Sequence, residues 1–269
     1  DPTQFKGDYP KFFKWMEKLK LPQTYYITQL HGANIDHIRK KARIDQYIRR
    51  NQYKKAEVLF KQLEKEFKEK KLIDYCPENK QYFLRIKTIL ERELHEISLQ
   101  QDKEQLEKAI HYTIPEYPSK RLEKRPLLKQ EVMVLNNLAS SYSRERNYKK
   151  ILSIWEKIIK SYENNSLYGY AEYDGYNLVL INYSNVIGNT KDYKQSTKKS
   201  YESIIHSFKE GIMERVVHCC YNIACNREQE MLEQEGRIMR EDACQRKLQQ
   251  AEIIAKISKD VFYIDFLSN

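Results

Sequence analysis

Three asparagines stand at matching places in a repeated tripeptide in the second half of the sequence. The tripeptides are Asn137-Leu138-Ala139, Asn182-Tyr183-Ser184 and Asn222-Ile223-Ala224. Asparagine is a poor residue for a helix interior, so three of them in helix-like segments need a physical reason. A primary amide offers two donors and one acceptor, which can pair with the main chain of an extended peptide. The pattern therefore favours peptide binding. Hydrogen bonds between neighbouring helices, or chance, are the alternatives.

No other set of residues has a spacing typical of catalysis or metal binding. The six histidines show no paired spacing for a metal or a catalytic triad, and the sequence has no glycine-rich phosphate loop and no Gly-x-Ser-x-Gly elbow. The cysteines are odd in number and fit no common metal pattern: Cys76, Cys219, Cys220, Cys225 and Cys244. We therefore expect no catalytic residue, no metal site and no cofactor, and we do not expect an enzyme.

The helices that would position the asparagines are predicted from internal repeats. Three segments begin at a tyrosine that follows a polar turn, at Tyr53, Tyr148 and Tyr193. Steps of three and four residues place the side chains that follow on one helix face. In the Tyr53 segment these side chains are Ala56, Phe60, Leu63 and Phe67. In the Tyr148 segment they are Ile151, Trp155, Ile158 and Tyr162. The third segment carries Ser200, Ile204 and Phe208, which implies a slip of one residue near its end.

Each of these segments pairs with a periodic helix before its turn, and two further pairs complete the chain. One lies between the first two segments and uses Leu90, Leu94, Ile97, Leu106 and Ile110. The other pairs a helix near residues 214–232 with one near 241–257. Phe262, Ile264, Phe266 and Leu267 form an apolar closing segment, as expected for the cap of a repeat array, although an uncovered end would favour dimerisation.

The hairpins resemble the tetratricopeptide repeat. Leu135, Leu138, Ala139, Tyr142, Ile151 and Trp155 match its order and spacing. The repeat is irregular, because Tyr148 and Tyr193 are 45 positions apart rather than the usual ~34. The resemblance implies an all-α, right-handed superhelix of about five hairpins over residues 31–269.

In this repeat class the first helix of each hairpin lines a concave groove, and the asparagine position faces that groove. Residues one or two turns away on the same helix face extend the predicted site. The predicted peptide-binding residues are Asn137, Ser140, Arg144, Asn182, Asn185, Asn189, His218 and Asn222. Arg144 is expected to take a carboxylate, because its guanidinium can bind one with two hydrogen bonds.

The composition favours long helices, and the cysteine content favours a reducing compartment. Glycine is rare, at 7 of 269 residues, and no proline follows Pro126. The net charge of +10 suits an acidic partner or nucleic acid, but a solvated lysine-rich surface explains it equally simply. Reduced cysteines that fill the core point to the cytoplasm. We identify no secretion signal and no apolar run long enough to span a membrane.

Two longer segments are similar to a particular family. One runs from Asn79-Lys80-Gln81-Tyr82 to Tyr112-Thr113-Ile114-Pro115, and the other from Leu135-Asn136-Asn137-Leu138-Ala139 into the Tyr148 segment. Together they look like the helical sensor half of the peptide-pheromone regulators of Gram-positive bacteria, the group of Rgg, Rap, NprR, PlcR and PrgX. The resemblance implies a cytoplasmic, homodimeric transcription regulator in quorum sensing, whose peptide changes the array or the dimer.

In that family a helix-turn-helix DNA-binding domain usually precedes the repeats. Residues 1–30 are predicted to be the remnant of such a domain, or a capping helix, and DNA would be bound only through this missing or partial part. Two alternatives stay open. One is a passive protein-binding scaffold, and the other is a modulator of a signalling protein that does not bind DNA.

Overall fold

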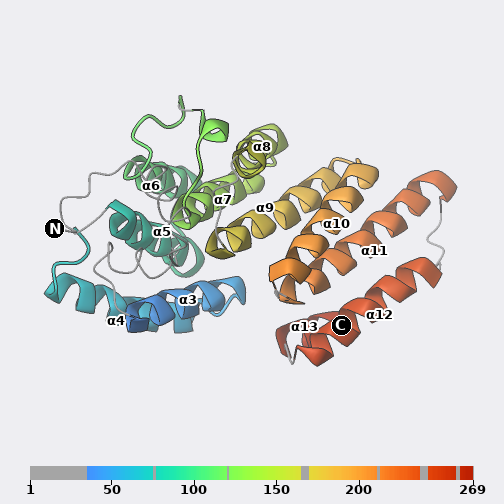
Figure 1. The fold of residues 1–269 in the computed structure, drawn as a ribbon, viewed down its shortest axis with the longest axis horizontal. Helices are drawn as coiled ribbons and strands as arrows, with labels where there is room; N and C mark the ends of the chain where they lie inside the picture. Colours follow the sequence, from blue (N-terminus) through green and yellow to red (C-terminus); the bar gives the residue numbers. More distant parts are fainter. Residues whose placement is uncertain are drawn as a thin grey trace, which may run out of the picture. The chain divides into compact units, whose positions relative to one another are not determined.

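A computed structural model describes residues 35–74, 77–119, 121–164, 170–210, 213–236, 242–258 and 261–268. These residues form the helices α3 to α13 and no strand (Figure 1), with labels as in the figure. Among them, no helix has the length and apolar character that would let it cross a membrane. The predicted remnant domain at residues 1–30 and Cys76 lie outside the described residues. The predicted all-α fold class is confirmed.

The chain divides into two compact units, Asp1–Gly169 and Tyr170–Asn269, and each is described by itself. Unit 1 contains three hairpins. They are formed by α3 (Ile35–Arg49) with α4 (Tyr53–Glu69), α5 (Pro77–Leu94) with α6 (Leu99–His111), and α7 (Lys129–Arg144) with α8 (Tyr148–Asn164). A short 3-10 helix, η2 (Leu122–Lys124), packs against α8.

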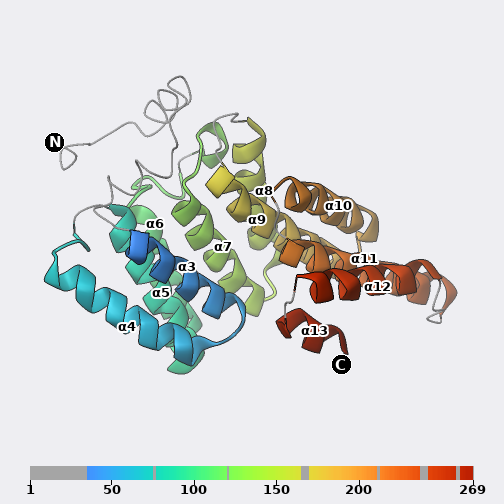
Figure 2. The same cartoon turned by 60° about the horizontal axis from the view of Figure 1, so that its bottom comes forward.

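Unit 2 contains two hairpins and a closing helix. The hairpins are α9 (Tyr170–Asn189) with α10 (Tyr193–Glu210) and α11 (Met213–Glu235) with α12 (Asp242–Ile257). The closing helix, α13 (Val261–Ser268), packs against α12, and its Ile264 and Leu267 contact the core formed by Val216 and Val217. Figure 2 shows α13 beside α12 from a second direction. The five predicted hairpins and the closing segment are therefore confirmed.

The three turns predicted before Tyr53, Tyr148 and Tyr193 share one backbone geometry. In each turn one residue adopts the left-handed conformation, with φ of 56° at Asn51, 54° at Arg146 and 71° at Lys191. The next amide then donates back to a carbonyl of the first helix, at 2.9 Å for Gln52 to Tyr47, 3.1 Å for Asn147 to Tyr142 and 3.3 Å for Asp192 to Ile187. This is the Schellman type of helix ending. It stops the first helix and starts the second at the predicted tyrosine.

The cores of α4 and α8 follow the predicted register. The predicted residues of both helices are buried: Ala56, Phe60, Leu63, Phe67, Ile151, Trp155, Ile158 and Tyr162. Full burial of one such side chain is worth about 1.5–3 kcal/mol relative to exposure. These residues therefore carry much of the packing energy of unit 1.

The predicted slip in α10 is wrong. Phe208 is 57% exposed, while the buried residues continue the register of α8 as serines. They are Ser196, Ser200, Ser203 and Ser207, all at 0% exposure. The prediction failed because it assumed that an inward face must be apolar, whereas hydroxyls can be buried when they find hydrogen-bond partners.

The four described cysteines, Cys219, Cys220, Cys225 and Cys244, are reduced thiols. Three of them are buried, and burial raises the pKa of Cys219 to about 12. A thiol with so high a pKa is almost entirely protonated at neutral pH and is a poor nucleophile. The prediction that the cysteines are core-filling thiols is confirmed for Cys219, Cys220 and Cys244.

Candidate functional site

In unit 1 the first helices of the three hairpins are joined by a buried arginine. Arg85 of α5 is 1% exposed, and its Nη2 lies 2.6 Å from Oδ1 of Asp45 on α3. Its Nη1 approaches Oδ1 of Asn137 on α7 at 3.5 Å, a long and therefore weak hydrogen bond. The Nε of Arg85 has no hydrogen-bond partner. One guanidinium thus links α3, α5 and α7 and keeps one donor unused.

The sequence prediction included Asn137 but missed Arg85 and Asp45. The available signal was a charged residue inside the apolar run Tyr82-Phe83-Leu84-Arg85-Ile86. A buried charge is costly unless it is paired, so such a residue predicts a partner on a neighbouring element. The partner, Asp45, lies 40 positions away, and its identity could not be read from the sequence.

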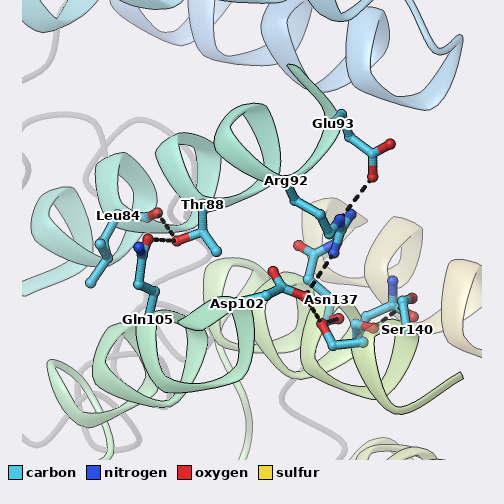
Figure 3. Close-up of polar contacts among 10 residues, drawn as sticks. Leu84, Thr88, Arg92, Glu93, Asp102, Gln105, Asn137 and Ser140 are labelled. Carbon is cyan, nitrogen blue, oxygen red and sulfur yellow. Dashed lines mark hydrogen bonds and ion pairs between the residues drawn. The ribbon is translucent and has the colours of Figure 1, made fainter. Parts of the chain in front are cut away.

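A second polar cluster joins α5, α6 and α7 (Figure 3). The fully buried Asp102 of α6 accepts a hydrogen bond from the Ser141 hydroxyl of α7 at 2.6 Å. Its Oδ2 also lies 3.5 Å from Nη1 of Arg92 on α5. Oδ1 of Asp102 is buried and has no hydrogen-bond partner, so the cluster holds the helices together through Oδ2 alone. It supplies a rigid base for the α7 residues Asn137 and Ser140, which Figure 3 shows on the same helix.

The other predicted α7 residues differ in exposure. Ser140 is half-buried, and its hydroxyl donates to the carbonyl of Asn136 in the preceding turn at 3.0 Å. Arg144 is exposed at the end of α7. Asn137 is half-buried, so part of the residue remains accessible. On α7 the predicted residues that remain accessible therefore carry an amide, a hydroxyl and a guanidinium.

In unit 2 neutral side chains join the first helices. Nδ2 of Asn185 on α9 lies 3.2 Å from Nε2 of His218 on α11. Asn222 of α11 is buried, and its amide donates to the Ser184 hydroxyl of α9 at 3.2 Å. Asn182 is half-buried and Asn189 is exposed.

His218 is held in its neutral form. Burial, and next the positive charge of Arg215, lower the pKa of His218 to about 4. A neutral imidazole has one donor and one acceptor, so it can accept the Asn185 amide proton. At neutral pH the contact between α9 and α11 therefore carries no net charge.

Two of the three asparagines, Asn137 and Asn222, thus bond to a neighbouring first helix. Asn137 accepts from α5, and Asn222 donates to α9. This matches the alternative that the sequence left open. The three asparagines are also not equivalent, because Asn222 is buried while Asn137 and Asn182 are half-buried. Among the described residues, no group of three or more His, Cys, Asp or Glu side chains could hold a metal ion.

Comparison with known proteins gives structural likeness without sequence likeness. No family model and no curated protein matches the sequence. The structure is similar to that of Bacillus thuringiensis PlcR, solved with the peptide PapR7 and DNA, with a TM-score of 0.66, 18% identity and coverage of 94% of this chain and 82% of PlcR. It is also similar to BtubC (BKLC) from P. vanneervenii, with a TM-score of 0.54, 12% identity and coverage of 92% and 88%.

The apo form of RapI is a further structural neighbour, with a TM-score of 0.50, 12% identity and coverage of 84% of this chain and 67% of RapI. A structure described as a kinesin light chain with tetratricopeptide-like repeats, from Podosopora anserina, matches at a TM-score of 0.50 and 12% identity, over 82% of this chain and 95% of that one. At these identities the likeness establishes the fold, which is tetratricopeptide-like.

Proposed function

We propose that this chain is the peptide-sensing module of a transcription regulator and that it binds an extended peptide along its first helices. The observation that carries the proposal is that first helices of each unit carry half-buried asparagines: Asn137 of α7 in unit 1, and Asn182 and Asn185 of α9 in unit 2. An extended peptide has a donor and an acceptor at most residues, and side-chain amides can satisfy both.

Arg144 would select the charge and the orientation of the peptide by binding a carboxylate of it. This guanidinium is exposed at the end of α7, the helix that also carries Asn137. It could bind a peptide carboxylate with two parallel hydrogen bonds, which a lysine ammonium cannot do. The favoured ligand is therefore a short peptide that carries an acidic residue or a free carboxyl terminus.

The links between first helices give a physical route from binding to a change of shape. The contact of Arg85 with Asn137 is long, so a peptide that bonds to the half-buried Asn137 could replace it, although Arg85 itself is buried and is not reached by the peptide. The contact of Asn185 with His218 is equally open to exchange. A peptide can shift the array only by its difference in affinity for the two arrangements, about 5.5 kcal/mol for a change from 1:99 to 99:1.

Support for the regulatory part comes from likeness to PlcR, whose solved complex contains a peptide and DNA, and to RapI. DNA binding in such a regulator would need a helix-turn-helix unit, which we do not assign to any of the five described hairpins. We propose that the protein acts in the cytoplasm as a homodimer, with α-helical hairpins transmitting the peptide signal.

The test is a screen of a short-peptide library against the chain, followed by titration of the peptides that bind. The Asn137→Ala, Asn182→Ala variant should weaken binding by about tenfold or more, since each lost amide contact is worth roughly 0.5–1.5 kcal/mol. The matched control is Asn164→Ala, because Asn164 is exposed near the end of the second helix α8. Its change should leave binding unaltered.

Arg144→Ala supplies an independent arm of the test, with Lys149→Ala on α8 as the exposed cationic control. Loss of affinity only in the Arg144 variant, and only for peptides with a carboxylate, would support the assigned role. If no peptide binds, or if the asparagine variant folds and binds equally well, the asparagines are structural links and the protein-binding scaffold becomes the better description.

A further inference from the structure

The helix α10 has its polar face buried and its apolar face exposed, the reverse of an ordinary surface helix. Its inward residues are four fully buried serines, Ser196, Ser200, Ser203 and Ser207. Three large apolar side chains point outward, with exposures of 43% for Tyr201, 54% for Ile205 and 57% for Phe208. Single exposed apolar residues are common, but three on one helix face are a feature of interaction surfaces.

These side chains belong to one continuous stripe. Residues separated by three or four positions share a helix face. The face that carries Tyr201, Ile205 and Phe208 therefore also carries two exposed lysines nearer the start of α10. The α10 stripe is defined as Lys194, Lys198, Tyr201, Ile205 and Phe208. Its first part is basic and its last part is apolar.

A pocket of about 380 Å³ opens beside the stripe, between α10, α11 and α12. In Figure 1 these three helices follow one another in unit 2, with α11 between the other two. Tyr201 and Lys194 of the stripe also line this pocket. Ile223, Ala224 and Cys244, at 7%, 1% and 2% exposure, form its apolar lining. The pocket could therefore receive one large apolar side chain from a molecule that lies along α10.

The charges around the stripe and the pocket are unbalanced. The carboxylate of Glu230 lies 2.9 Å from the guanidinium of Arg227, so this pair is nearly neutral. The ammonium of Lys247 donates to the neutral Gln250 and lies 5.3 Å from the ring centre of Tyr201. Lys194 and Lys198 add two exposed positive charges. The surface therefore complements an occupant that is negatively charged and apolar on adjacent sides.

We propose that the α10 stripe and its pocket form a docking surface for an acidic amphipathic helix of a partner protein. The partner's apolar side chains would pack on Tyr201, Ile205 and Phe208, and its carboxylates would face the lysines, as in other helix-in-groove complexes. This surface lies on the second helices α10 and α12 and on the side of α11 that carries Ile223 and Ala224, and it does not include the amides of Asn137, Asn182 and Asn185. The proposal therefore goes beyond peptide sensing and is tested independently of it.

A second copy of the chain fits this surface less well. In a symmetric contact the same patch meets itself, so the stripe lysines would face either lysines or apolar residues of the other copy. Three exposed apolar side chains are also few for a stable dimer, which usually buries at least ~1,200 Å² in total. Charge complementarity thus favours a different, acidic partner.

The test uses a fluorescein-labelled model helix with leucines on one face and glutamates on the other, followed by fluorescence polarisation. Its twin carries lysines in place of the glutamates. The wild-type chain should bind the acidic helix at least about tenfold more tightly than the basic twin, because the basic twin meets repulsion. Ile205→Ser, Phe208→Ser should weaken binding of the acidic helix by about tenfold or more, as loss of interface anchors does.

The matched control is Ile253→Ser, Ile257→Ser, which removes two exposed isoleucines of α12 with exposures of 55% and 75%. This control and the Asn137→Ala, Asn182→Ala variant should bind the acidic helix like the wild type. Equal binding of both model helices, or equal loss in the α12 control, would show unspecific hydrophobic attachment and overturn the proposal. No binding of the acidic helix would overturn it too.

Self-association is measured in parallel by analytical ultracentrifugation. If the wild-type chain dimerises and Ile205→Ser, Phe208→Ser alone makes it monomeric, the stripe is an interface between copies and the proposed acidic partner is wrong. If the variant leaves the oligomeric state unchanged while it loses the acidic helix, the stripe serves a different protein, as proposed.

Discussion

The helices α8 and α10 have the same register after their first tyrosine and opposite chemistry. Ile151, Trp155, Ile158 and Tyr162 of α8 correspond in spacing to Ser196, Ser200, Ser203 and Ser207 of α10, and all eight side chains are buried. In unit 1 the second helix is held by large apolar contacts. In unit 2 it is held by hydroxyls that bond to side chains of α9 and α11 and, at Ser196, to the main-chain carbonyl of Ser184. The same backbone repeat therefore tolerates two different means of packing.

Small residues on the facing sides of α9 and α10, such as Gly188 and Ser196, let these two helices of unit 2 approach closely. At Gly188 of α9, an added Cβ would lie 2.7 Å from Oδ1 of Asn226 and 3.2 Å from Oγ of Ser196. The Asn226 amide donates to the same serine at 2.7 Å. A larger residue at Gly188 would force the Asn226 side chain to shift, and this shift would disturb its hydrogen bond with Ser196.

The first helices show the same contrast. Unit 1 joins them through the ion pair of Arg85 with Asp45, whereas unit 2 uses Asn185 with His218 and Asn222 with Ser184. Breaking a buried ion pair leaves an uncompensated charge, which costs more than losing a neutral hydrogen bond. Rearranging the contacts of unit 2 therefore costs less free energy than rearranging those of unit 1.

The largest expected effect comes from Trp155→Ala in α8. Trp155 is 3% exposed and its Nε1 donates to Oδ1 of the buried Asn136 at 3.1 Å. Loss of the ring should lower the free energy of unfolding by about 3–5 kcal/mol, measured by urea denaturation. Trp155→Phe is the control and should cost less, since it keeps most of the apolar volume. A cost below ~1 kcal/mol for the alanine variant would contradict the picture of unit 1 as apolar packing.

Asn177→Ala tests the polar packing of unit 2 at its most connected residue. The fully buried Asn177 of α9 donates to the Ser207 hydroxyl at 2.7 Å and accepts from Ser203. Two buried hydroxyls would lose their partner, so unfolding should become easier by about 1–3 kcal/mol. Adding Ser203→Ala and Ser207→Ala should recover part of that loss, because no unpaired polar group then remains. A triple variant that is much less stable than the single one would refute this explanation.

The pH dependence separates the charged links of unit 1 from the neutral links of unit 2. His218 has a pKa of about 4 in the folded chain, below its ordinary value of 6.5, so the unfolded chain takes up the proton first as pH falls. The stabilisation by neutral His218 is thus complete above pH 6.5 and is lost as the pH falls to about 4. His218→Gln should remove this part of the acid sensitivity.

The measurement for His218 is the free energy of unfolding of wild type and variant, obtained by urea denaturation at pH values between 7 and 4. The difference between them should change by on the order of 1–2 kcal/mol in that interval, since one pKa unit corresponds to about 1.4 kcal/mol and the side chain is only partly shielded from water. Carboxylates titrate in the same range in both proteins and cancel. Parallel curves would mean that His218 is not held neutral.

Ser200→Ala should have the smallest effect. The Ser200 hydroxyl lies 3.1 Å from that of Ser184, and Ser184 keeps its contacts with the Ile181 carbonyl and the Asn222 amide. Alanine also favours the helix more than serine does. The free energy of unfolding should therefore change by no more than about 0.5 kcal/mol, measured as for Trp155. A loss as large as that of Trp155→Ala would show that register alone, and not side-chain size, sets the packing energy.

Much of the fold could be predicted from the sequence because it depends on local signals. The polar turns before Tyr53, Tyr148 and Tyr193 define where helices end and begin, and the left-handed residues at Asn51, Arg146 and Lys191 occupy the same position in each turn. Apolar residues at steps of three and four then mark the buried faces of α4 and α8. These signals act within one hairpin, so a linear pattern contains them.

The sequence by itself determined the all-α class, the five hairpins, the helix starts and the asparagine series. Only the tertiary structure decided which face of α10 is buried, because the serines are stabilised there by Asn177 and Asn226, residues 26 to 30 positions away in sequence. It also decided that Asn137 meets Arg85 and that Asn222 meets Ser184. A polar side chain becomes a core residue or a surface residue according to its partners, and those partners are brought together only when the helices pack.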